Sequence, residues 1–317
     1  FSVFLFFALS GCTLFISSAD KINSLKDWGI FYIRRFLRIW PVFAVSMLFY
    51  IGFIEVFKSH YFAARDLWIA QFLADYSFAN VLQYLSLTYN ITGPSYLFCG
   101  PYWSLPVEFQ FYLMLPAALI LMRRSSFGLV VPILFAFTLY VLYSTSLVHL
   151  EKYEVLKMGY TFFGGVLLAK LHRRVGLRLS FSVSVTAFFT LVLLVVLVSN
   201  NLVSLPSVLF RVFDLDHLCG ILAVLSVALA LFSKPIKYRS RLMDYLDEYG
   251  EISYSIYLFH MLFVGAAALI VVNLEIYTAN SKLIFIMLIS LGGSYWFSKY
   301  TYRYIEKTTI EWGRRLG

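Results

Sequence analysis

The chain has 317 residues, of which 61% are hydrophobic and only 14% are charged, and its net charge is +9. Soluble domains have about 45–50% apolar and about 25% charged residues, so this composition excludes a protein with one aqueous core. The surplus apolar surface must face a lipid bilayer, and the length allows about nine spanning helices of about 20 residues each. The basic residues fall between the apolar runs, which indicates membrane topology and excludes nucleic acid as the expected partner.

Nine apolar runs predict an all-α fold, a polytopic transmembrane helix bundle. The weakest run is short and contains Gly159, Gly164 and Gly165. The expected helices cover residues 1–19, 39–57, 103–122, 127–147, 158–169, 181–199, 218–233, 252–273 and 283–302.

The first residues, FSVFLFFALSG, already lie inside an apolar run and begin without Met. They lack the basic start and the small-residue cleavage site of a signal peptide. We therefore expect one upstream helix, which makes ten in the full-length protein. Residues 1–317 are then a single integral-membrane domain whose first helix is missing.

The basic residues between the runs predict the orientation. If residue 1 lies on the outer side of the membrane, 20 of the 26 Lys and Arg residues fall in segments on the inner side and six fall in segments on the outer side. This bias follows the positive-inside rule and requires the weak run at 158–169 to span the bilayer. We therefore expect the C-terminus in the cytoplasm.

The longest expected outer segment is 58–102. Apolar spacing over 61–87 predicts a helix on the membrane surface, and Gly and Pro in 93–103 turn the chain back into the membrane. Asn90 begins an Asn-Ile-Thr glycosylation pattern, which has no meaning in a bacterial protein.

The cysteines and the potential metal ligands give little indication of a disulfide bond or a metal site. Cys12, Cys99 and Cys219 form no CxxC motif, and we expect separate buried thiols over a Cys99–Cys219 bridge, which the topology permits. The segment FDLDHLCG (213–220) offers two carboxylates and one His, too few for a metal site, so we expect a solvated loop and no metal.

Glu108 is the clearest candidate for chemistry. It lies in the run 103–122, where a charge costs about 2.5–3.5 kcal/mol at a helix centre. Ser104 and Tyr112 lie four residues before and after it, on the same helix face. This polar stripe fits a general base, a holder of a catalytic His, or a structural carboxylate, and the residues alone do not separate these roles.

A basic cluster precedes the run 39–57. Arg34, Arg35 and Arg38 occur in YIRRFLRIWP, and Arg35 and Arg38 share a helix face. Guanidinium groups near a helix start suit a polyphosphate, but the same cluster suits ordinary anchoring to lipid headgroups. Taken in isolation, the cluster favours anchoring.

Ser253, Tyr257 and His260 form a second polar stripe, at i, i+4 and i+7 of the run 252–273. His260 could serve as an acid–base or ligand-contacting group. A buried His that only satisfies a hydrogen bond is the commoner case, and the stripe slightly favours it.

The order of four stretches is more specific than any single residue. FFALSG (6–11) contains Ser10 and Gly11, RRFLRIWP (34–41) contains the arginines, YWSLPVEFQFYLMLP (102–116) contains Trp103 and Glu108, and GEISYSIYLFH (250–260) precedes YRYIEKTTI (302–310). Together they resemble the membrane-bound acyltransferase-3 family, bacterial O-acyltransferases that modify cell-surface polysaccharides. Cys12 and Thr13 depart from the large apolar residues usual after the Ser-Gly pair.

The resemblance implies a bundle of about ten helices in the bacterial cytoplasmic membrane, with both ends cytoplasmic. It implies acyl-CoA as the usual donor substrate, with no permanently bound cofactor, and we expect acetyl-CoA here. Arg35 and Arg38 would meet the donor's phosphates, and Glu108 would be the glutamate of the Trp-Ser-Leu signature. The family's catalytic His and an Arg belong to its first helix, so we expect both upstream of residue 1.

The sequence thus predicts an integral-membrane O-acyltransferase that moves an acyl group, acetyl by expectation, from cytoplasmic acyl-CoA to a hydroxyl of a cell-surface glycan. Glu108 and His260 are the catalytic candidates. A transporter or flippase for a lipid-linked glycan is the alternative, and two matching interrupted helices in the two halves would favour it, but none is evident. A structural scaffold would leave Glu108 and the arginines without a role.

Overall fold

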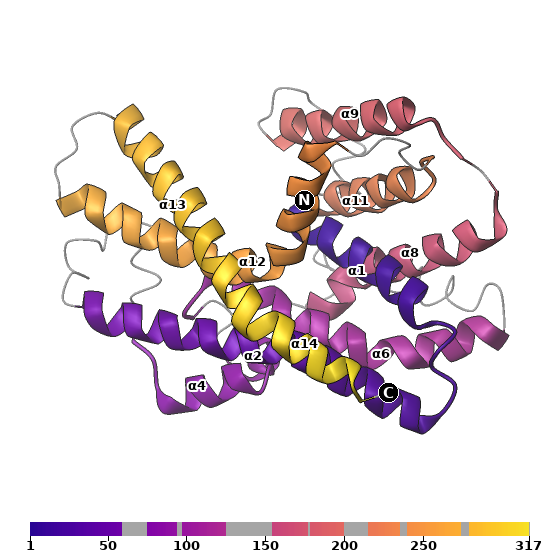
Figure 1. Cartoon of the computed structure of the whole chain (residues 1–317), viewed down its shortest axis with the longest axis horizontal. Coiled ribbons are helices and arrows are strands. Elements are labelled where there is room, and N and C mark those ends of the chain that lie inside the picture. Colours follow the sequence, from indigo (N-terminus) through magenta and orange to yellow (C-terminus); the bar gives the residue numbers. More distant parts are fainter. Residues whose placement is uncertain are drawn as a thin grey trace, which may run out of the picture. The chain divides into compact units, whose positions relative to one another are not determined.

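The computed structural model is helical (Figure 1). It describes residues 1–58, 75–93, 97–124, 154–176, 178–199, 215–234, 240–273 and 279–316. The chain divides into two compact units, and each is described by itself. The first unit comprises Phe1–Trp28 with Val107–Tyr238, and the second comprises Gly29–Pro106 with Arg239–Gly317.

The first unit is built around a pair of helices, α1 (Ser2–Ser18) and α8 (Glu154–Arg174), which pack along each other. Phe7 of α1 meets Phe111 edge-on at 5.4 Å, and Phe111 stacks on Phe162 at 4.7 Å. These rings form the apolar centre of the unit. The other helices among its described residues are α6 (Ser104–Arg124, within the unit from Val107), α9 (Phe181–Ser199) and α11 (Leu215–Leu231).

Two glycines set the distance between α1 and α8. A Cβ at Gly11 would collide with the carbonyl of Phe162, and a Cβ at Gly165 would collide with the carbonyl of Ala8. The two backbones therefore touch where each helix offers no side chain, as is common between membrane helices. Gly165, one of the glycines that make the 158–169 run look weak, thus serves packing, and α8 is a full 21-residue helix.

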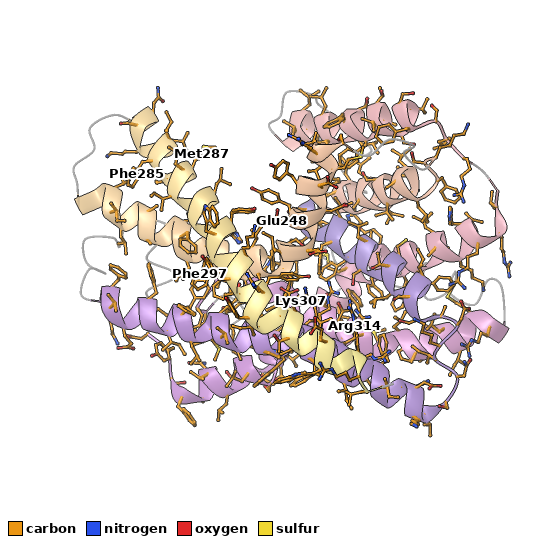
Figure 2. All side chains as sticks on the ribbon, viewed as in Figure 1. Glu248, Phe285, Met287, Phe297, Lys307 and Arg314 are labelled. Carbon is orange, nitrogen blue, oxygen red and sulfur yellow. The ribbon has the colours of Figure 1, made fainter. Side chains whose placement is uncertain are left out.

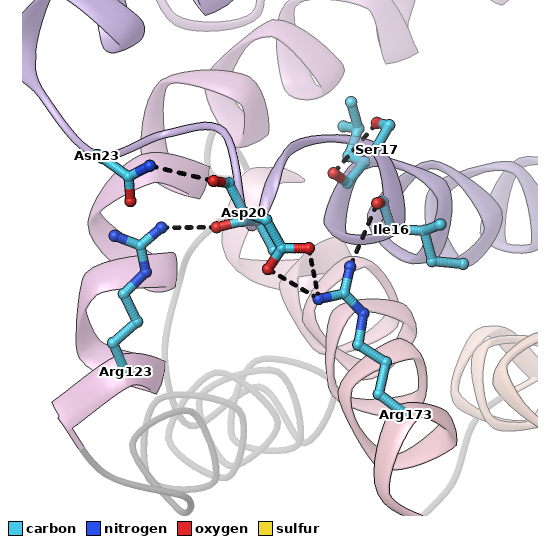
Figure 3. A network of polar contacts seen from close by, with 8 residues as sticks. Ile16, Ser17, Asp20, Asn23, Arg123 and Arg173 are labelled. Carbon is cyan, nitrogen blue, oxygen red and sulfur yellow. Dashed lines mark hydrogen bonds and ion pairs between the residues drawn. The ribbon is translucent and has the colours of Figure 1, made fainter.

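The segment after α1 is fastened by basic side chains (Figure 3). Arg173 of α8 pairs with the Asp20 carboxylate at 2.9 Å, and Arg123 of α6 donates to the carbonyl of Ala19 at 2.6 Å. Lys170 donates to the carbonyl of Met122 at 2.7 Å. Several basic residues of the predicted inside loops therefore hold helix ends together as well as setting the charge bias.

The second unit is built on α2 (Leu25–Phe57, within the unit from Gly29), α12 (Arg241–Asn273) and α13 (Ala279–Thr301). Phe297 of α13 contacts Phe49 of α2 at 5.1 Å and Phe259 of α12 at 4.8 Å. Figure 2 labels Phe297 on α13 and Glu248 on α12. After α13, a π-helical turn, η4 (Tyr302–Glu306), leads into α14 (Lys307–Arg314), so that the three form one long rod in Figure 1.

Short elements of the second unit carry a cluster of tyrosines. They are α4 (Phe78–Leu85), α5 (Tyr89–Thr92) and the 3₁₀ turn η3 (Gly100–Trp103). Tyr84 and Tyr89 stack at 3.8 Å, and the Tyr89 hydroxyl donates to the carbonyl of Tyr102 at 2.6 Å. Burial raises the pKa of Tyr89 well above its ordinary value, so the phenol stays protonated and remains a donor.

The helices identify a multi-pass membrane protein. Among the described residues, five stretches are long and apolar enough to cross a membrane: Leu25–Phe57, Gly100–Ile120, Phe181–Val198, Arg241–Val271 and Asn280–Arg314. Ser2–Ser18 and Asp216–Leu231 are shorter apolar helices. The expected helix at 127–147 and most of the expected surface helix lie outside the described residues, so the count of nine spans stays a prediction.

Two helices begin several turns earlier than expected. The runs 39–57 and 252–273 become α2 from Leu25 and α12 from Arg241. The start of α2 is capped, because the Asp27 carboxylate accepts from the backbone N–H groups of Asn23 and Ser24 at 2.9 and 2.8 Å. A search for apolar runs does not detect such polar first turns.

Candidate active site

Glu108 and Tyr112 form a buried pair on α6. Glu108 is 4% exposed and Tyr112 3%, and the tyrosine hydroxyl donates to Oε1 of the glutamate. The pair uses the i, i+4 spacing of one helix face. A buried carboxylate needs such donors, because the charged form loses its hydration.

The third member of the predicted stripe, Ser104, turns to another helix. Its Oγ lies 2.7 Å from the hydroxyl of Tyr257 on α12, and this hydroxyl donates to the carbonyl of Pro101 at 2.5 Å. Two of the four sequence stretches, 153 residues apart, therefore meet through their hydroxyl groups. Trp103, half-buried, closes η3 immediately before Ser104.

The remaining polar groups of the second stripe bond to their own helix. Ser253 donates to the carbonyl of Gly250 at 2.7 Å. His260 directs Nδ1 at the carbonyls of Tyr257 (2.9 Å) and Ile256 (3.2 Å), so Nδ1 carries the proton and Nε2 keeps its lone pair. The imidazole is half-buried and is held in one orientation.

The three arginines of α2 differ in their contacts. Arg34 donates from Nε to the carbonyl of Gly313 at 3.0 Å and from a terminal nitrogen to that of Arg314 at 3.5 Å. This arginine caps the end of α14, where carbonyls lack helix partners. The Arg35 guanidinium lies 5.5 Å from the centre of the Phe31 ring.

Arg38 is exposed and differs from the other two. It interacts electrostatically with Tyr302 and Glu306 of η4. Of the cluster, Arg34 thus has a structural contact, while Arg38 presents its charge at the surface of the unit.

Ser10 and Gly11 lie on α1. Gly11 faces the backbone of α8, as shown above. Ser10 is half-buried and its carbonyl accepts a hydrogen bond from Thr13 at 3.2 Å. The contacts of this signature are those of helix packing.

Sequence reasoning missed one buried polar pair. Ser255 is fully buried, Glu306 is 1% exposed, and the serine Oγ donates to the carboxylate at 2.8 Å. The stretches that contain both residues were singled out, but neither side chain was. A carboxylate in YRYIEKTTI, between a spanning helix and a basic tail, looks like a solvated group, but Glu306 ends the π-turn and is buried.

The other candidates are accounted for. Cys12, Cys99 and Cys219 are buried thiols, as expected. The solvated loop expected at 213–220 is wrong from Leu215 onward, because Asp216 and His217 lie in the first turn of α11 and His217 is buried. Asp214 lies outside the described residues. Within the described ranges, no three His, Cys, Asp or Glu side chains come together as a metal site would require.

Comparison with protein families matches residues 1–299 to a single model, described as an acyltransferase domain and named acyltransferase 3. The match spans both compact units and includes Glu108, the three arginines and His260. No curated protein and no solved structure matches the chain.

Proposed function

Because the chain belongs to the acyltransferase 3 family, and so transfers acyl groups, we propose that it is a bacterial O-acetyltransferase of the cytoplasmic membrane. The donor is cytoplasmic acetyl-CoA, and the acceptor is a hydroxyl of a cell-surface glycan or a lipid-linked precursor. The family match over residues 1–299 carries this proposal, and the multi-pass architecture supports it. The transporter alternative has no comparable support.

The donor is held in the N-terminal half of α2. Arg35 and Arg38 meet the CoA phosphates, since guanidinium groups form bidentate, charge-assisted hydrogen bonds with phosphate oxygens. The exposure of Arg38 supports this role, and the contacts of Arg34 with α14 give that residue a structural one. The positive-inside bias supports a cytoplasmic location for these residues, with nine spans in residues 1–317.

The acyl step is an attack of the acceptor hydroxyl on the thioester carbonyl. A carbon–oxygen bond forms, the carbon–sulfur bond breaks, and the hydroxyl proton passes through a protein base to the departing CoA sulfur. Glu108 takes this proton or holds the group that takes it. Its burial and its contact with Tyr112 support a fixed carboxylate in an apolar setting.

His260 is the second catalytic candidate. Its Nδ1 is occupied by carbonyls of α12, and the lone pair on Nε2 suits a proton acceptor or a hydrogen bond from an acceptor sugar. The Ser104–Tyr257 contact at 2.7 Å holds the adjoining turn of α12 against the start of α6. These hydroxyls are positioning groups in the proposal.

The direct test is incubation of membranes containing the protein with acetyl-labelled acetyl-CoA, with and without a candidate glycan. Label should appear in the glycan only when protein, donor and glycan are all present. Membranes that hydrolyse acetyl-CoA without labelling any glycan hydroxyl, over a panel of surface polysaccharides, would contradict the proposed acceptor class.

The arginines provide the test of the donor site. Arg35→Ala or Arg38→Ala should weaken donor affinity about ten- to a hundredfold, as expected for a lost contact with a charged group of about 1.5–3 kcal/mol. Lys should restore only part of the affinity, because it lacks the bidentate fork. Lys21→Ala, which removes an exposed charge from the same inside segment, is the matched control. Donor affinity that is unchanged in both Arg→Ala variants would leave the cluster as a lipid anchor.

A further inference from the structure

A buried carboxylate lies next to the proposed donor site in the second unit. Glu306 ends the π-turn η4 and is 1% exposed, although it belongs to a polar stretch of sequence. Its Oε2 accepts a hydrogen bond from the fully buried Ser255 of α12 at 2.8 Å. π-turns are rare, cost regular hydrogen bonding, and occur frequently at functional sites.

The Ser255–Glu306 bond ends a series of polar contacts along α12. Glu248 pairs with Lys299 at 2.5 Å, and Glu251 accepts from the Tyr302 hydroxyl at 3.3 Å. The first two contacts are accessible to solvent, whereas the last is buried. A carboxylate that only fastened α12 to the chain after α13 would be cheaper at the surface, because burial removes its hydration. The depth of Glu306 therefore calls for a reason other than attachment.

Arg38 provides that reason. Its guanidinium interacts electrostatically with Glu306. One residue later, the carbonyl of Ile39 accepts from the Tyr254 hydroxyl of α12 at 2.9 Å, which fixes α2 against α12 at this point. The residue that follows Arg38 and the carboxylate of Glu306 thus contact neighbouring residues of α12, Tyr254 and Ser255, while the Arg38 side chain stays exposed and able to contact another anion.

We infer that Glu306, held by Ser255, is a positioning residue that keeps the Arg38 guanidinium aimed at the donor's phosphates. The inference rests on the proposed function, since it presupposes that Arg38 binds the donor. An exposed arginine has many rotamers, and ordering it when phosphate binds costs entropy. The carboxylate of Glu306, held in one place by Ser255, favours the productive rotamers before the donor arrives.

The test is a double-mutant cycle on the full chain in lipid nanodiscs, with radiolabelled CoA as the binding probe and acetyl-CoA for kinetics. Glu306→Gln should weaken CoA binding and raise the donor KM roughly five- to tenfold, within the range for residues of one network, with kcat nearly unchanged. In an Arg38→Ala background, the same change should have almost no further effect. Glu306→Asp should restore part of the affinity.

Glu248→Gln is the matched control, because it removes a carboxylate from the same helix contact without an interaction with Arg38. It should leave CoA binding unchanged. If Glu306→Gln fails to accumulate in membranes, Ser255→Ala, which keeps the charge but frees the carboxylate, should show the same selective rise in donor KM.

The failures can be told apart. Normal CoA binding by Arg38→Ala would overturn the donor site and this inference with it. Weakened binding by Arg38→Ala, with normal binding by both Glu306→Gln and Ser255→Ala, would overturn the inference alone. Additive effects in the double variant, or tighter CoA binding by Glu306→Gln, would also contradict it, since the carboxylate would then act independently of Arg38 or merely repel phosphate.

Discussion

At the scale of single residues, Glu108 has the environment of a functional carboxylate. Its neighbours in sequence are apolar, it is almost fully buried, and the Tyr112 hydroxyl bonds to one oxygen. A low-dielectric setting strengthens the interaction of such a group with a proton or a partner. A structural carboxylate would share the burial but not the dependence of turnover on charge.

Glu108→Gln separates these roles, because it keeps the shape and removes the charge. We expect normal amounts of protein in membranes and a loss of turnover of about 10²- to 10⁴-fold, the usual contribution of a general acid–base group. Tyr112→Phe, which deletes only the hydroxyl, should lose less. Turnover would be measured as acetyl transfer at saturating donor and acceptor, and near-normal turnover of the Gln variant would remove Glu108 from the site.

The sequence shows that Ser104, Glu108 and Tyr112 are polar residues within an apolar run, but it does not show what their side chains contact. Ser104 was expected to share a face with Glu108, yet its hydroxyl bonds to Tyr257, 153 residues away. Helix periodicity gives the face of one helix and says nothing about which other helix lies opposite. Glu306 was missed for the same reason, since its burial depends on a π-turn and on Ser255.

At the scale of elements, the contact between α1 and α8 depends on the absence of side chains. Gly11 and Gly165 each face the backbone of the other helix, so each position excludes even a methyl group. The Ser-Gly signature therefore marks where a second helix approaches. Apolar-run analysis treats the same glycines as helix breakers, because it counts propensity and not packing.

Gly11→Ala and Gly165→Ala should destabilise the protein, each by about 1–3 kcal/mol, the usual cost of overpacking. Gly52→Ala is the control, because nothing lies near its Cβ position and Ala favours the helix by roughly 0.5–1 kcal/mol. Thermal unfolding in detergent measures the three variants. An unfolding temperature of Gly165→Ala equal to that of Gly52→Ala would mean that α1 and α8 do not touch as described.

At the scale of the whole molecule, the positive-inside bias was readable from sequence because it depends on counts and not on contacts. The apolar centres of the described spans were also readable. The polar first turns of α2 and α12 were not, since they are helical through capping and through contacts with other elements. These turns are also where the arginines and the polar contacts of α12 lie.

The orientation can be tested with thiol labelling, because the three native cysteines are at most 5% exposed and should react little. Lys21→Cys should resist a membrane-impermeant maleimide added to intact cells and react after permeabilisation. Thr92→Cys, on the exposed surface of α5, should react without permeabilisation. Labelling of Lys21→Cys in sealed cells would reverse the proposed topology and move the donor site to the wrong side.

The π-turn between α13 and α14 has a consequence for how this part of the chain can vary. In a regular helix each residue advances the rotation by about 100°, so deletion of one residue from Tyr302–Glu306 would turn everything after it by about that angle. Gly313 would leave the reach of Arg34, and Glu306 would rotate away from Ser255. Substitutions in this turn are tolerated as long as these contacts are kept, but a change in its length is not. Natural relatives should therefore differ here by substitution and hardly ever by insertion or deletion.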